Sequence, residues 1–168
     1  MRPAIAAGLL AVAAGMIGCQ WGPLTVSRQP PKPVDQVYKV ALRISPPMPL
    51  NWDDRPGLDG FQAQVNFFQF DQPLSVTVQG VLEFMLYEGL GSAKVLAETK
   101  PFHTWAFDGA TLRRHQGKTM FGWGYAMRLP WGSSPPKSSS VTLIARYRPA
   151  GGGKDIPSDP LHVAMGPK

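Results

Sequence analysis

The chain has 168 residues, a formal net charge of +6 and one cysteine. This length fits a single domain with a substantial core, and a lone cysteine excludes a disulfide within the chain. The positive net charge favours anionic lipids or anionic surface polymers as partners. Lys and Arg nevertheless stand singly and form no polybasic segment.

The N-terminus carries Arg2 followed by an apolar, Ala-rich run over residues 3–18. A membrane-spanning helix needs about 20 mostly apolar residues, and this run meets Gln20 and Pro23 too early. A basic start before a short apolar run is typical of a secretory signal. We therefore predict a signal peptide over residues 1–18.

Four residues, Met16-Ile17-Gly18-Cys19, close this apolar run. They resemble the lipobox of bacterial lipoproteins, and the resemblance implies that Cys19 carries a covalent lipid once the signal is removed. A thioether at Cys19 would also account for the single cysteine of an exported chain. Ordinary signal cleavage near Gly18 is the alternative.

The same resemblance predicts a location and a class of partner. Gln20 after the cysteine is compatible with sorting to an outer membrane. We expect an exported protein, lipid-anchored through Cys19 at an outer membrane or periplasmic face, with an envelope protein or polymer as partner. We expect no nucleic-acid partner, and no cofactor apart from the covalent lipid.

Residues 19–37 contain prolines at 23, 30, 31 and 33. Proline fixes φ and removes a hydrogen-bond donor, so this stretch predicts an extended, flexible tether rather than a helix or a central strand. The alternative is an N-terminal segment that packs along the domain.

From Tyr38 onward, apolar and polar residues alternate in short runs separated by Pro and Gly turns. One short helix is expected over residues 109–116, with Asp108 as its cap and Gly117 as its stop. The alternation predicts strands over residues 38–45, 61–70, 75–87, 95–99, 102–107, 121–131, 141–148 and 161–165.

This pattern predicts an all-β fold over residues 38–166, a single antiparallel Greek-key β-sandwich of seven to eight strands. The order of elements resembles immunoglobulin-like or C2-like domains. The Cys, Trp, Cys framework of true immunoglobulin domains is absent from the sequence.

No catalytic motif is complete. Gly117-Lys118-Thr119 follows a helix rather than a strand and lacks the first glycine of a phosphate loop. Ser134 and Lys137 have the spacing of a serine acylase, but two prolines between them preclude the required helical turn. His103, His115 and His162 lack the spacing of a zinc site. Because none of these motifs is complete, we expect no enzymatic activity.

Two groups of residues are candidate ligand sites. Asp53, Asp54 and Asp59 lie in the loop between the first two strands, where C2-like domains gather carboxylates for calcium, although all three residues are ordinary in turns. Trp123, Tyr125 and Trp131 lie on one aromatic strand that favours either a sugar-binding platform or a buried core face.

The charged residues Arg128, Arg146 and Arg148 are expected on an outer sheet face, as solvated charges or as contacts for a polyanion. The leading expectation is a membrane-anchored lipoprotein with a structural or protein-interaction role at the cell envelope. The alternative is a ligand-binding module for carbohydrate or for calcium-dependent contact with an anionic surface.

Overall fold

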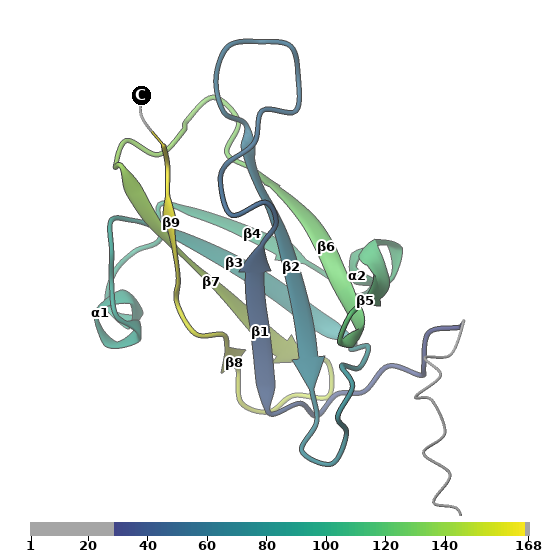
Figure 1. The fold of residues 1–168 in the computed structure, drawn as a ribbon. Coiled ribbons are helices and arrows are strands. Elements are labelled where there is room, and N and C mark those ends of the chain that lie inside the picture. Colours follow the sequence, from purple (N-terminus) through teal and green to yellow (C-terminus); the bar gives the residue numbers. More distant parts are fainter. Residues whose placement is uncertain (1–28, 167–168) are drawn as a thin grey trace, which may run out of the picture.

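The computed structural model describes residues 29–166, which form nine strands and two short helices in two antiparallel sheets (Figure 1). One sheet has the order β1-β2-β6-β5, and the other has the order β4-β3-β7 with β8 and β9 both paired to β7. The strands are β1 (Lys39–Ile44), β2 (Gly60–Phe68), β3 (Gly80–Glu88), β4 (His103–Phe107), β5 (Gln116–Thr119), β6 (Gly122–Pro130), β7 (Ser140–Pro149), β8 (Ile156–Pro157) and β9 (Leu161–Ala164).

The strand order confirms the predicted all-β sandwich. The chain changes sheet three times, between β2 and β3, between β4 and β5, and between β6 and β7. In the letters used for immunoglobulin-type sandwiches, β1-β2-β6-β5 reads A-B-E-D, and β3-β7-β9 reads C-F-G. β4 adds a strand beside β3, at the edge away from β7.

The core lies between the two sheets and follows the predicted alternation. Along β2 the side chains of Phe61, Ala63, Val65 and Phe67 are fully buried, while Gln62 and Gln64 between them are not. Full burial of a side chain such as Phe or Leu contributes about 1.5–3 kcal/mol. The facing sheet contributes the buried residues Leu82, Phe84, Leu86, Val141, Leu143, Ala145 and Tyr147.

One predicted strand is wrong, because residues 95–99 belong to helix α1 (Ala93–Ala97) and the turn after it. Leu96 is the buried residue of α1 and packs with Tyr87 and Ile144 on the outer side of the second sheet. A window of five residues is compatible with both the helical and the strand periodicity. Ala, Lys and Leu favour a helix when no partner strand is adjacent. The short strands β5 and β8 were not predicted.

The predicted helix is confirmed as α2 (Gly109–His115). The Asp108 carboxylate accepts a hydrogen bond from the backbone N–H of Thr111 at 2.7 Å, as an N-cap does. This bond holds the pKa of Asp108 below its usual value. Leu112 is fully buried and fastens the helix to the core, and the chain enters β5 at Gln116 without a glycine stop.

The segment before β1 packs on the domain, contrary to the predicted tether. The backbone N–H of Val34 donates to the carbonyl of Thr77 at 2.9 Å, and the Thr77 hydroxyl donates to the carbonyl of Pro31 at 2.8 Å. Val37 is a buried core residue. Residues 31–37 therefore belong to the folded unit, and residues 19–28 of the predicted tether lie outside the described residues.

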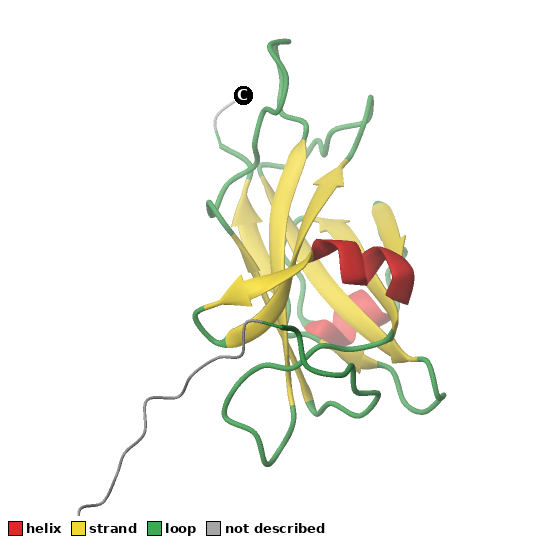
Figure 2. Ribbon diagram, turned by 90° about the vertical axis from the view of Figure 1, so that its right-hand side faces the viewer, coloured by secondary structure: helices red, strands yellow, loops and turns green. Residues whose placement is uncertain are grey.

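The sandwich has two distinct ends (Figures 1 and 2). At the entry end lie residues 29–38, the loop 69–79 and the turn between β5 and β6. At the far end lie the loops 45–59 and 131–139 and the end of β9. Every residue of the core cluster falls between Val34 and Met165. In the described part of the chain, no helix is long and apolar enough to cross a membrane.

Candidate binding pocket

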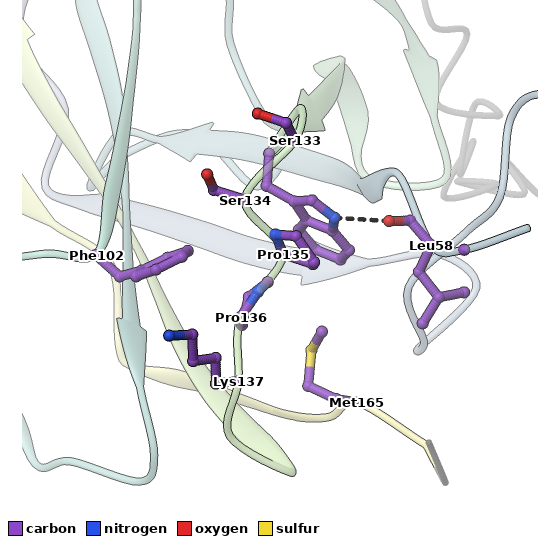
Figure 3. A pocket seen from close by; sticks show the side chains of 10 residues that line it. Leu58, Phe102, Ser133, Ser134, Pro135, Pro136, Lys137 and Met165 are labelled. Carbon is purple, nitrogen blue, oxygen red and sulfur yellow. Dashed lines mark hydrogen bonds between the residues drawn. The ribbon is translucent and has the colours of Figure 1, made fainter.

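A pocket of about 770 Å³ opens at the far end of the sandwich (Figure 3). Its walls come from the loop before β2, the residue before β4, the loop between β6 and β7, and the chain after β9. The lining residues are Gly57, Leu58, Phe102, Trp131, Ser133, Ser134, Pro135, Pro136, Lys137 and Met165. Its volume lies within the usual range of ligand pockets, about 300–1,000 Å³.

Trp131 holds two of these walls together. It follows β6 directly, and its indole N–H donates to the carbonyl of Leu58 at 2.6 Å, the bond drawn as a dashed line in Figure 3. Its backbone N–H donates to the carbonyl of Asp59 at 3.0 Å. The indole meets the buried Phe61 ring edge to face at 5.1 Å. Trp131 therefore ties the loop 45–59 to the core.

The loop 131–139 forms a second, stiff wall. Pro135 and Pro136 follow one another, and Pro136 is buried. The backbone N–H of Lys137 donates to the Glu88 carboxylate at 2.6 Å, so the loop is fastened to the end of β3. Proline restricts the backbone, so this anchored loop forms a stiff wall of the pocket.

The remaining lining is apolar and partly exposed. Leu58 is 41% exposed and Phe102 is 38% exposed, whereas Met165 is buried. Figure 3 shows these three side chains arranged around Pro135 and Pro136. Ser134 and Lys137 both line the pocket, but on a proline-containing loop instead of a helix. The pocket therefore suits an apolar group, with hydroxyl groups and an ammonium at its rim.

The three predicted aromatic residues do not share one platform. Tyr125 is a core residue whose hydroxyl accepts a hydrogen bond from the backbone N–H of Val78 at 2.8 Å. Trp123 lies at the entry end of β6, with the Lys118 ammonium 5.9 Å from its ring centroid. Eight strand residues place Trp123 about 26 Å from Trp131. Of the three, only Trp131 lines the pocket.

Sequence reasoning missed Leu58, Phe102 and Met165 as candidate site residues. Leu58 and Phe102 lie in loops next to glycine or proline, and Met165 follows the last strand. Single apolar residues in such segments are common on protein surfaces, so no local signal marked them.

The three aspartates of the calcium hypothesis have separate roles in their loop. A carboxylate oxygen of Asp53 accepts from the backbone N–H of Arg55 at 2.9 Å, and one of Asp59 accepts from that of Trp52 at 2.6 Å. Asp54 is exposed. Within residues 29–166, no group of three His, Cys, Asp or Glu side chains is close enough to hold a metal.

The three arginines do not lie on one face. Arg146 and Arg148 lie on the outer face of the second sheet, where Arg146 meets Glu83 at 2.5 Å and Arg148 meets it at 3.2 Å. Each also lies 3.6 Å from Asp155. Arg128 belongs to the other sheet, and its guanidinium lies 5.4 Å from the Trp52 ring centroid.

Cys19 lies outside the described residues, so the structure adds no geometry at the predicted lipidation site. Comparisons with protein-family models, with curated proteins and with solved structures return no match.

Proposed function

We propose that this chain is an exported lipoprotein whose sandwich domain binds an apolar segment of an envelope protein in the far-end pocket. In this proposal Cys19 carries the covalent lipid, the signal over residues 1–18 is removed, and the domain stands at an outer membrane or periplasmic face. Its role is one of protein interaction and not of catalysis.

The observation that carries the proposal is the position of the pocket relative to the incoming chain. Residues 29–38 enter the sandwich at one end (Figure 1), and the residues that line the pocket lie in the loops at the other end. A lipid on Cys19 would hold the entry end toward the membrane. The pocket would then face away from the bilayer, where a partner protein can reach it.

The chemistry of the pocket supports binding over catalysis. Its lining is mainly Leu, Phe, Trp, Pro and Met, and the ionisable side chain in it is that of Lys137. A buried aromatic residue beside exposed apolar residues is a common arrangement at the centre of a protein interface. A β-sandwich is also a frequent fold of non-catalytic modules, although the fold alone assigns no function.

The anchor is tested by expressing the full chain in a bacterium fed a clickable fatty acid. We expect label on the wild-type protein and a shorter mature chain in the membrane fraction. Cys19→Ala should abolish labelling and leave the precursor unprocessed. A Cys19→Ala chain that is still labelled and processed would contradict the proposed anchoring.

The pocket is tested by placing a photo-cross-linking residue at Ser134 of the full chain. We expect a discrete adduct in envelope membranes that Leu58→Glu or Phe102→Glu removes, because each puts a carboxylate into the apolar lining. Leu90→Glu is the matched control, since Leu90 is 70% exposed and lies outside the pocket. An adduct that survives both pocket variants would exclude this mode of binding.

The carbohydrate alternative has a distinct readout in the same protein. Titration with soluble cell-wall glycan would quench Trp fluorescence, and Trp131→Phe would weaken that quenching. We expect neither effect if an apolar protein segment is the ligand.

A further inference from the structure

Four large apolar side chains are exposed at the entry end. Tyr38, Phe70, Met120 and Phe121 are 45%, 88%, 78% and 44% exposed, and they are four of the nine large apolar side chains exposed among residues 29–166. They come from the segment before β1, the loop after β2 and the turn before β6. We call them, with Lys39 and Arg43, the entry-end patch.

Each aromatic ring of this patch packs against another aromatic ring. Tyr38 stacks on Phe70 with 4.2 Å between ring centroids. Phe121 meets Phe68 edge to face at 6.5 Å. The backbone N–H of Tyr38 donates to the carbonyl of Phe68 at 3.0 Å, which fastens the segment before β1 to the end of β2. The sandwich therefore presents these rings from a fixed surface.

Positive charge accompanies the exposed rings. The Arg43 guanidinium lies 5.5 Å from the Phe121 ring centroid, and Lys39 and Arg43 line a hollow of about 260 Å³ with Phe121. Strands β1, β2, β5 and β6 contain four basic residues, Lys39, Arg43, Lys118 and Arg128, and no Asp or Glu. Asp71, next to Phe70, is the acidic residue in the adjoining turn.

Apolar rings beside Lys and Arg match the chemistry of an anionic bilayer surface. Aromatic and methionine side chains enter the boundary between headgroups and acyl chains, while the cations meet lipid phosphates. A sugar or a nucleotide would not require an exposed methionine and a phenylalanine that is 88% exposed.

The path of the chain brings this patch to the membrane. Residues 19–28 precede the described part, and ten residues reach at most about 35 Å when fully extended. Residues 29–38 then run into the end of the sandwich that bears the patch (Figures 1 and 2). An acyl chain on Cys19 would keep this end at a high effective concentration near the bilayer.

We propose that the entry-end patch docks on an anionic phospholipid surface, so that the domain lies against its membrane with the pocket turned outward. This inference rests on the proposed acylation of Cys19 for its location. The contacts themselves come from Tyr38, Phe70, Met120, Phe121, Lys39 and Arg43, and they do not require the acyl chain.

The test uses the chain from residue 19 to 168 with Cys19→Ala in every sample, since all residues of the core cluster lie within it. Sedimentation with vesicles of phosphatidylglycerol and phosphatidylcholine measures binding, and vesicles of phosphatidylcholine alone are the neutral comparison. We expect binding to the anionic vesicles, at least about tenfold weaker binding to the neutral ones, and weakening with added salt.

Matched variants distinguish vesicle binding through the patch from nonspecific adhesion of exposed apolar residues. Phe70→Ser with Met120→Ser should reduce vesicle binding at least about tenfold, because it removes the two most exposed apolar side chains of the patch. Leu90→Ser with Val95→Ser removes side chains that are 70% and 59% exposed elsewhere and should leave binding unchanged. Lys39→Glu should weaken binding, whereas Lys94→Glu on α1 should not.

Three outcomes would overturn docking on the membrane. These are equal binding to neutral vesicles, equal loss in the control variants, and no vesicle binding together with a dimer that Phe70→Ser disperses. The last outcome would assign the patch to a second copy of the chain. Because every sample lacks an acylated cysteine, such a failure leaves the fatty-acid labelling of Cys19 as an independent result.

Discussion

The indole N–H of Trp131 donates to the backbone carbonyl of Leu58 at 2.6 Å, and this bond joins two loops that are far apart in the sequence. Trp131 is 2% exposed, and Leu58 offers its partly exposed side chain to the pocket from the same residue that accepts the bond. The shape of the pocket therefore depends on a hydrogen bond that no local pattern specifies.

Trp131→Phe should lower the free energy of unfolding by about 1–3 kcal/mol, because it leaves the Leu58 carbonyl without its donor and opens a void. Trp105→Phe is the matched control, since the Trp105 indole donates to the carbonyl of Pro130 at 2.8 Å in an exposed setting. We expect that control to cost less than about 1 kcal/mol. Urea denaturation measures the free energy of unfolding of both variants. Equal losses would contradict a larger contribution from the Trp131 hydrogen bond.

Gly124→Ala should destabilise the first sheet by about 1–3 kcal/mol. An added Cβ would lie 2.7 Å from the Asn66 amide nitrogen and 2.9 Å from the Val65 carbonyl oxygen. Asn66 is 3% exposed and already donates to the hydroxyls of Ser75 and Thr119, so moving its amide away would break these hydrogen bonds.

Gly117→Ala is the control for Gly124→Ala, because Gly117 pairs with Gly124 across β5 and β6. Apart from Gly117 itself and its two chain neighbours, no residue has an atom within 4 Å of a Cβ added at Gly117. We expect a change of less than about 0.5 kcal/mol in the free energy of unfolding. A similar loss for both variants in thermal denaturation would contradict the steric explanation.

The free energy of unfolding should decrease as the pH rises above about 10. Burial raises the pKa of Tyr125 and of Tyr147 above that of a free phenol, and the negative charge of Asp35 raises that of Tyr147 further. A raised pKa in the folded state means that the unfolded chain ionises first as pH rises, so stability present below pH 10 is lost above it.

Tyr147→Phe tests the origin of this alkaline loss. The variant removes the hydrogen bond from the Tyr147 hydroxyl to the carbonyl of Gln79, so it should be less stable at neutral pH. Its free energy of unfolding should nevertheless fall less steeply with pH than that of the wild type. Denaturant titrations at several alkaline pH values measure the slope, and an unchanged slope would refute the assignment.

Glu83→Gln should cost about 1–2 kcal/mol, because the carboxylate accepts hydrogen bonds from both Arg146 and Arg148. Its side chain is only 15% exposed. Asp155→Asn should cost less than about 0.5 kcal/mol, since Asp155 lies 3.6 Å from each arginine and is 36% exposed. Added salt should lower the free energy of unfolding of the wild type more than that of Glu83→Gln. Denaturation at increasing NaCl concentrations measures this difference.

Local periodicity was sufficient for the sandwich and for most of its strands. Alternation over β2 separated Phe61, Val65 and Phe67 from the glutamines between them, and these three side chains are buried in the core, because side chains on successive strand residues point to opposite faces. It failed over residues 95–99, where five residues fit a helix as well as a strand. The edge strands β5 and β8 are too short to leave a pattern.

The aromatic candidates show the limit of the same reasoning. Alternation placed Trp123, Tyr125 and Trp131 on one side of β6, but it does not report what covers that side at each point. Tyr125 is buried in the core, Trp123 is partly buried beside Lys118 of the edge strand β5, and Trp131 meets a loop from elsewhere in the chain. How deeply each residue of a strand is buried depends on which other segments pack against it in the folded protein.

By itself, the sequence determined the all-β class, the alternating core faces and a lone cysteine in a signal-like context, because each depends on residues close together in the chain. Only the tertiary structure decided which loop residues meet. Strand pairing brings Leu58, Phe102 and Met165 to one end and Tyr38, Phe70 and Phe121 to the other. Basic residues that stand singly in the sequence share one acid-free sheet for the same reason, since register and sheet order act over long separations.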